Sequence, residues 1–73
     1  MSKLKPGRLV ILTNAPVSLL HGLPEEDQAA IKSIVGQPVT LAGYSYGQAE
    51  LEFIDGHGDG HTIWVETTLI RPA

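Results

Sequence analysis

Apolar and polar residues alternate along much of this chain with the period of two that is typical of β-strands. The clearest case spans residues 48–54, in which three apolar side chains alternate with Glu50 and Glu52. Residues 9–12 are instead apolar without a break, which predicts a strand that is covered on both faces. Turn-forming residues separate these runs. The pattern predicts five strands, over residues 8–13, 39–44, 48–54, 61–66 and 69–71.

A single helix is predicted over about residues 24–35, between the first two strands. Pro24 suits the first helical position, because its missing N–H would be unpaired there in any case. Acidic residues at 25–27 place negative charge at the positive end of the helix dipole. Gly36 suits the left-handed position after the helix, and Pro38 prevents its continuation. Residues 14–22 are expected to form an irregular connection.

A chain of 73 residues has room for one domain, residues 1–73. Five short strands in an open sheet would leave both edges exposed, and closure into a barrel removes those edges. The expected fold is therefore mainly β, a five-stranded barrel with one helix inserted between strands 1 and 2.

Two short segments resemble those of SH3-like small β-barrels. Pro6-Gly7-Arg8-Leu9-Val10 is similar to the Pro-Gly-x-x-Val opening of many such barrels, and Trp64-Val65 followed by Leu69-Ile70 resembles their fourth strand, one-turn 3₁₀ segment and fifth strand. In outline the chain is similar to small accessory subunits built on this fold, such as the PsaE-type subunit of photosystem I and the β-subunit domain of nitrile hydratase. It departs from them by its helix between the first two strands. It also lacks the Ala-Leu-Tyr-Asp-Tyr segment and the paired tryptophans of signalling SH3 domains, so the resemblance implies an accessory barrel and no binding of proline-rich peptides.

The composition adds constraints on the cellular compartment. The chain has no cysteine, which excludes disulfides and thiolate metal sites and suits a reducing cytoplasm. The N-terminal segment lacks the apolar core of a signal peptide, and no apolar run is long enough to span a bilayer. We therefore expect a cytoplasmic protein without membrane association.

Charge is distributed unevenly along the chain. The formal net charge of -3 argues against a general phosphate-binding surface. Basic residues nevertheless gather near the two ends of the chain, at Lys3, Lys5, Arg8 and Arg71. If the terminal segments lie side by side, these residues form a small basic patch on an acidic body. The simpler interpretation is that they are solvated chain ends.

A glycine-rich segment, residues 55–66, carries the densest set of candidate ligands. Its spacing nearly matches a twelve-residue calcium loop that begins at Asp55 and ends at Glu66, although His57 supplies nitrogen where oxygen is wanted and the flanking helices are missing. The alternation of Asp55, His57, Asp59 and His61 also suits nickel or zinc. The simpler interpretation is a hairpin loop whose Asp-Gly pairs supply positive φ angles.

No pattern in the sequence indicates catalysis. The serines and histidines lack the context of a nucleophile elbow, and Glu50 and Glu52 are explained by solvation of an outer strand face. The glycines of residues 56–60 precede a strand, whereas a phosphate cradle precedes a helix. We therefore expect no enzymatic activity, no catalytic residues and no cofactor.

The aromatic residues are the best candidates for binding a partner. If Ile63 and Val65 face the core, Trp64 faces outward; alternation places Tyr44 on the outer side of its strand, and Tyr46 lies at a hairpin tip. The alternative is that Trp64 packs under residues 14–22 or against the helix, because a small domain needs its large apolar side chains.

The sequence therefore favours a non-catalytic protein-interaction or accessory module, such as a small subunit of a larger assembly. Its acidic surface would select a basic or neutral protein partner. One alternative is a nucleic-acid-binding barrel, similar to KOW or Tudor-type modules, that uses the terminal basic residues with an aromatic. Another is a metal- or calcium-binding domain that uses residues 55–66.

Overall fold

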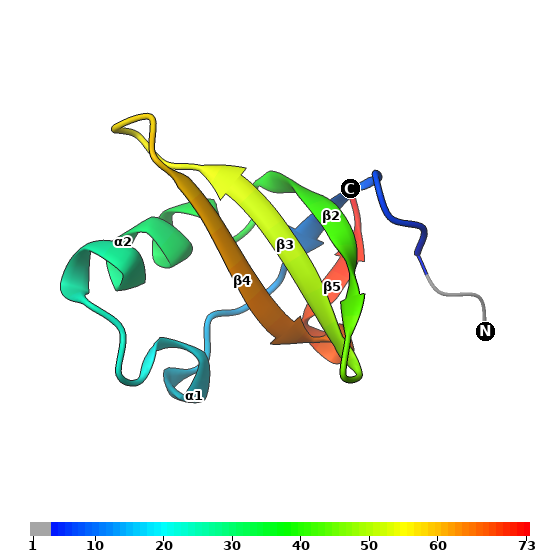
Figure 1. The fold of residues 1–73 in the computed structure, drawn as a ribbon, viewed down its shortest axis with the longest axis horizontal. Helices are drawn as coiled ribbons and strands as arrows, with labels where there is room; N and C mark the ends of the chain where they lie inside the picture. The colour runs from blue at the N-terminus through cyan, green and yellow to red at the C-terminus, as the bar shows by residue number, and fades with distance from the viewer. Residues whose placement is uncertain (1–3) are drawn as a thin grey trace.

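Five antiparallel strands form one sheet in the computed structural model, which describes residues 4–73. The strands are β1 (Leu9–Leu12), β2 (Pro38–Ser45), β3 (Gln48–Ile54), β4 (Gly60–Glu66) and β5 (Ile70–Pro72). Their order across the sheet is β4-β3-β2-β1-β5 (Figure 1). The five predicted strands are thus confirmed. β4 and β5 are the edge strands, and within the described chain no ladder joins them, so the sheet is not closed into a barrel.

Two helices connect β1 to β2, where the sequence predicts one. The predicted helix is α2 (Glu25–Ile34), which begins directly after Pro24; Gly36 follows it with a φ of 84°, as expected for the left-handed position. The second helix, α1 (Val17–Leu20), is a single turn inside the segment expected to be irregular. It is too short to leave a helical period in the sequence. Within residues 4–73, no helix combines the length and the apolar content that a membrane crossing requires.

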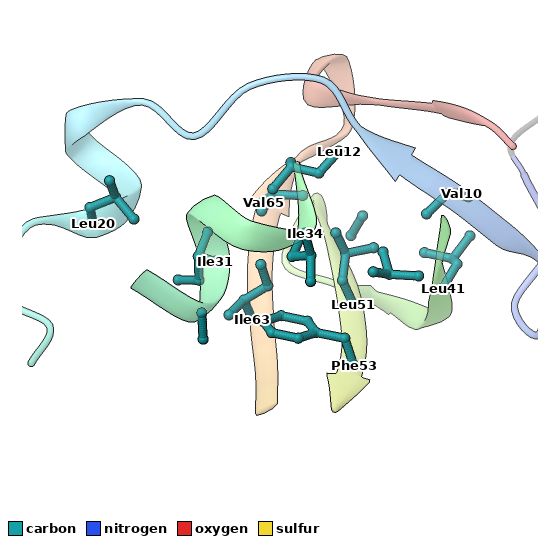
Figure 2. Packing of buried hydrophobic residues seen from close by; sticks show 13 residues of the cluster. Val10, Leu12, Leu20, Ile31, Ile34, Leu41, Leu51, Phe53, Ile63 and Val65 are labelled. Carbon is teal, nitrogen blue, oxygen red and sulfur yellow. The ribbon is translucent and has the colours of Figure 1, made fainter. Parts of the chain in front are cut away.

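The core lies between α2 and one face of the sheet, which we call the inner face. Ile31 and Ile34 point from α2 into a cluster with Leu51, Phe53 and Ile63 of the sheet (Figure 2). Their helical spacing places them on one side of α2, and the alternation in β3 and β4 places the others on one side of the sheet. The buried cluster comprises Val10, Leu12, Leu20, Ala30, Ile31, Ile34, Val39, Leu41, Ala49, Leu51, Phe53, Ile63 and Val65.

Burial alternates along β1 although its sequence does not. Val10 and Leu12 are fully buried on the inner face, whereas Leu9 is 53% exposed and Ile11 is half-buried on the opposite, outer face. The expectation that this strand is covered on both faces is therefore wrong at Leu9. The reason is that α2 packs against the inner face.

A β-bulge in β2 places Tyr44 on the inner face of the sheet and not on the outer face. Leu41 pairs with Leu51, but Gly43 pairs with Glu50, so β2 accommodates one extra residue at this point. As a result Tyr44 stands opposite the buried Ala49, and residues directly opposite each other share a face. The prediction that Tyr44 lies on the outer side of its strand is therefore wrong, because strict alternation from Leu41 does not continue through the bulge.

Replacing Ile31 tests how much the sheet depends on α2. Ile31→Ala is expected to lower the free energy of unfolding by about 2–5 kcal/mol, because it removes buried methyl groups and leaves a cavity under the sheet. Lys32→Ala, on the exposed side of the same helix, should change it by less than about 0.5 kcal/mol. Urea unfolding followed by circular dichroism measures both, and equal effects of the two variants would contradict the packing described above.

Candidate functional site

His61 on β4 joins the β3–β4 loop to α2. Its Nε2 lies 2.7 Å from Oδ2 of Asp55, and its Nδ1 lies 3.7 Å from Oδ1 of Asp27 in the first turn of α2. The imidazole ring also stacks on Phe53, with ring centroids 5.1 Å apart and planes inclined by 15°. The side chains of His61 and Asp55 are largely buried, whereas that of Asp27 is more open to solvent. These contacts tie one end of the helix to the hairpin.

Asp55 uses its carboxylate to build the β3–β4 loop. Its Oδ1 accepts hydrogen bonds from the backbone N–H groups of His57, at 2.8 Å, and Asp59, at 3.0 Å, while Oδ2 faces His61. The hydrogen bond with the His61 side chain, followed by the one from the Asp59 N–H, lowers the pKa of Asp55 from 3.8 to about 2. One carboxylate oxygen is thus occupied by N–H groups of the loop and the other by His61 of β4, and Asp55 acts as a structural anchor.

The predicted metal ligands do not come together around one point. Asp55 and His61 are in contact, but Glu66 pairs with Gln48 at the opposite end of the β3–β4 hairpin. The loop that carries His57 and Asp59 turns around Asp55 and is not extended. In the part of the chain that the structure describes, no group of three or more His, Asp or Glu residues is arranged to hold a metal ion. The second half of the twelve residues of the predicted calcium loop forms strand β4, which carries Glu66 away from Asp55.

Within residues 4–73, one hydroxyl residue lines the cleft that His61 shares with α2 and the β3–β4 loop. A cleft of about 820 Å³ lies between α2 and the loop, and both ring nitrogens of His61 face carboxylates there. Ser33, the hydroxyl residue that lines this cleft, donates its hydrogen bond to the Ala30 carbonyl at 2.6 Å. Nucleophilic catalysis needs a hydroxyl within reach of a free ring nitrogen. The cluster is therefore explained by its role in holding the hairpin to the helix.

Trp64 lies on the outer face of β4, and 46% of its surface is exposed. Its neighbours Ile63 and Val65 are buried on the inner face, so Trp64 faces outward, which is one of the two orientations that the sequence left open. The indole borders a groove between the end of β4 and α1, to which Leu19 and Leu69 contribute apolar side chains. The groove explains how a large aromatic side chain remains half in solvent and half against the protein.

Three carboxylates lie close to Trp64 on the outer face. Glu50 stands directly opposite Trp64 in the β3–β4 ladder, and Glu52 is its diagonal neighbour. Glu66 follows two residues later on the same face of β4. Neither strand contains lysine or arginine. The sequence shows these residues separately, and it is the register of the β3–β4 ladder that brings them together.

The other two predicted aromatics occupy different surroundings. Tyr44 packs against the core, and its hydroxyl donates a hydrogen bond to the Leu4 carbonyl at 2.7 Å. Tyr46 is fully exposed at the tip of the β2–β3 hairpin. The φ values of 50° at Tyr46 and 78° at Gly47 are those of a type I′ turn, which suits a two-residue hairpin loop. The structure thus separates Tyr44 from Trp64, which lie on opposite faces of the sheet.

The two terminal segments lie side by side, which is the condition that the sequence sets for a basic patch. β1 pairs with β5, which brings Arg71 opposite Ile11, and the N–H of Ala73 donates to the Leu9 carbonyl at 3.3 Å (Figure 1). Lys5, Arg8 and Arg71 are exposed in this region, and Lys3 lies outside the described residues. Trp64 lies on the edge strand at the other side of the sheet, so these basic residues do not share a strand pair with it.

A second exposed apolar area, which the sequence reasoning missed, lies at the other end of the outer face. Ile54 is 71% exposed and lines an open cleft together with Leu9 and Pro38. The sequence does contain a signal for this exposure. Ile54 lies an even number of residues from Glu50 and Glu52, so it falls on the same side of the strand as these two exposed acids. An apolar residue on the polar side of an alternating strand is expected to be exposed.

Asp55→Asn tests the anchoring role of the loop carboxylate. The folded-state pKa of about 2 lies below the ordinary value of 3.8, so the native state binds its proton less readily than the unfolded state. The stability that Asp55 contributes is therefore fully present above about pH 4 and is lost as the pH falls to about 2. Thermal unfolding across this range should show a shallower fall in Tm for Asp55→Asn than for the wild type. Asp59→Asn, an exposed position in the same loop, should keep the wild-type slope.

Tyr44→Phe tests whether Tyr44 is structural. Loss of the hydrogen bond to the Leu4 carbonyl is expected to lower the free energy of unfolding by about 0.5–1.5 kcal/mol. Tyr46→Phe, at the exposed hairpin tip, is the matched control and should stay within about 0.5 kcal/mol of the wild type. Urea denaturation of the three proteins measures the difference, and an unchanged midpoint for Tyr44→Phe would show that the hydroxyl contributes nothing to stability.

Comparison of this chain with protein-family models, with curated proteins and with solved structures finds no match. Its function is therefore inferred from the side chains and surfaces described above.

Proposed function

We propose that this protein is a non-catalytic interaction module, of the kind found as small accessory subunits, which binds a protein partner through the outer face around Trp64. The observation that carries the proposal is the half-exposed indole at the border of a groove. The chain has one tryptophan and one phenylalanine. Leaving the tryptophan out of the core therefore gives up much of the large aromatic surface that the domain could bury. Tryptophan is also enriched at the centres of protein interfaces.

The arrangement of the sheet supports an accessory role. The helices leave the outer face of β3 and β4 uncovered, so the ring of Trp64 and the groove beside it are accessible to another chain. The 3₁₀ turn η1 (Thr67–Leu69) between β4 and β5, together with the antiparallel meander, supports the resemblance to SH3-like accessory barrels. Fold resemblance by itself says little about function, so Trp64 carries the greater weight.

Nucleic-acid binding is a second candidate, supported by the position of the terminal basic residues. Pairing of β1 with β5 brings Arg8 and Arg71 into one region, with Lys5 in the preceding turn. Few phosphate contacts are available there, and the rest of the protein is acidic. Fluorescence anisotropy with single-stranded and duplex probes separates the two candidates, because phosphate binding weakens steeply as salt is raised.

Trp64→Ala tests the proposed interaction surface. Truncating a tryptophan at an interface centre commonly costs about 2 kcal/mol or more, so recovery of a stoichiometric partner from the source cells should fall by at least about tenfold. The measurement is quantitative affinity capture with the tagged protein, after thermal unfolding has shown that the variant is folded.

Leu9→Ala is the matched control, because Leu9 is similarly exposed but belongs to the other apolar area. It should retain the partner. Loss of the partner with Leu9→Ala and retention with Trp64→Ala would place the interface on β1 to β3 and contradict the proposal.

A further inference from the structure

We propose that the partner presents a basic segment, and that an arginine side chain of this segment stacks on Trp64 between Glu50, Glu52 and Glu66. This inference rests on the proposed function, since it concerns the same surface and names the chemistry of its occupant. It follows from three features of the outer face: the charge of the side chains around the indole, the lack of a partner for that charge among residues 4–73, and the apolar groove beside it.

The charge around Trp64 is of one sign. Glu50 is its direct cross-strand partner, Glu52 its diagonal neighbour, and Glu66 its neighbour along β4. Since β3 and β4 carry no lysine or arginine, the potential over the indole is negative. The face of an indole is also the negative region of its quadrupole, so ring and carboxylates attract a cation in the same place.

Within residues 4–73, these carboxylates have no partner inside the protein. Among the residues that the structure describes, the close contacts between acidic and basic side chains are those of His61 with Asp55 and with Asp27, and none involves Glu50, Glu52 or Glu66. Their side chains also accept no hydrogen bond within this part of the chain. Like charges on neighbouring strands repel one another, and a cation bound between them relieves that repulsion.

Arginine fits this surface better than lysine. Its planar guanidinium stacks on an aromatic face and presents donors along its edge to carboxylates, whereas the ammonium of lysine is a compact, strongly hydrated point charge. The neighbouring groove, which Leu19 and Leu69 help to line, would accept an apolar side chain next to the arginine. The expected recognition element is therefore an arginine beside a leucine or a residue of similar size.

A set of short synthetic peptides tests this specificity. The first peptide carries an Arg-Leu pair in a glycine-serine background, and the others replace the arginine with lysine, citrulline or glutamate. Trp64 is the chain's single tryptophan, so its fluorescence and its indole N–H resonance report directly on the site. The arginine peptide should bind most tightly and lose affinity as salt is raised. Citrulline keeps the shape of arginine without its charge and should bind at least about tenfold more weakly.

Charge-neutral variants separate local from general electrostatics. The combined substitutions Glu50→Gln, Glu52→Gln and Glu66→Gln should weaken the arginine peptide by about tenfold. A matched control with the same change in net charge, Glu25→Gln, Glu26→Gln and Asp59→Asn, alters exposed carboxylates away from Trp64 and should leave the affinity within about twofold. Equal weakening by both sets would overturn the inference, because it would show that net charge alone attracts the peptide.

The remaining outcomes distinguish the inference from the proposed function. If the citrulline and arginine peptides bind equally, the partner is recognised by apolar contact; the inference then falls while the interaction surface stands. If no peptide perturbs Trp64, recognition of a basic segment is overturned, and the capture experiment with Trp64→Ala decides separately whether this surface binds a protein at all.

Discussion

The packing of α2 against one face of the sheet is the interaction on which the rest of this structure depends. A sheet that is apolar on one face must bury that face against another layer, and Ile31 and Ile34 provide that layer over Leu51 and Phe53. Because the helix covers one face, the sheet acquires an inner and an outer side. The exposed side chains of Trp64, Leu9 and Ile54 lie on the side that α2 leaves uncovered.

The most conspicuous polar cluster of the chain maintains this packing. His61 contacts Asp55 in the hairpin loop and Asp27 on α2, while Asp55 also fixes the loop backbone through two N–H groups. A histidine flanked by carboxylates often indicates metal or proton chemistry, but here each group is used to join two elements. The cluster thus stabilises the layer arrangement, and the exposed Trp64 with its neighbouring carboxylates lies on the opposite face of the sheet.

Two local features of the sheet determine which aromatic side chain is available. The bulge after Leu41 turns Tyr44 toward the core, where its hydroxyl binds the backbone of the N-terminal segment. No bulge interrupts β4, so its alternation continues and Trp64 stays on the outer face. The β3–β4 register then sets Glu50 against the indole. A one-residue difference in pairing thus separates a structural tyrosine from an exposed tryptophan.

The sequence by itself determined the strands and the main helix with its terminating glycine, because each depends on local periodicity or on a backbone angle that glycine or proline prefers. It left open whether Trp64 faces outward or packs under residues 14–22. It could not reveal α1, whose single turn has no period, or the exposure of Leu9, which depends on where α2 packs. Tertiary structure decided three further features. They are the face of the sheet on which Tyr44 lies, the contact of His61 with Asp27, and the position of the glutamates around Trp64. Each of these depends on which residues of two separate elements stand opposite each other, and that register is set by bulges and packing that leave no signal in the alternation of a single strand.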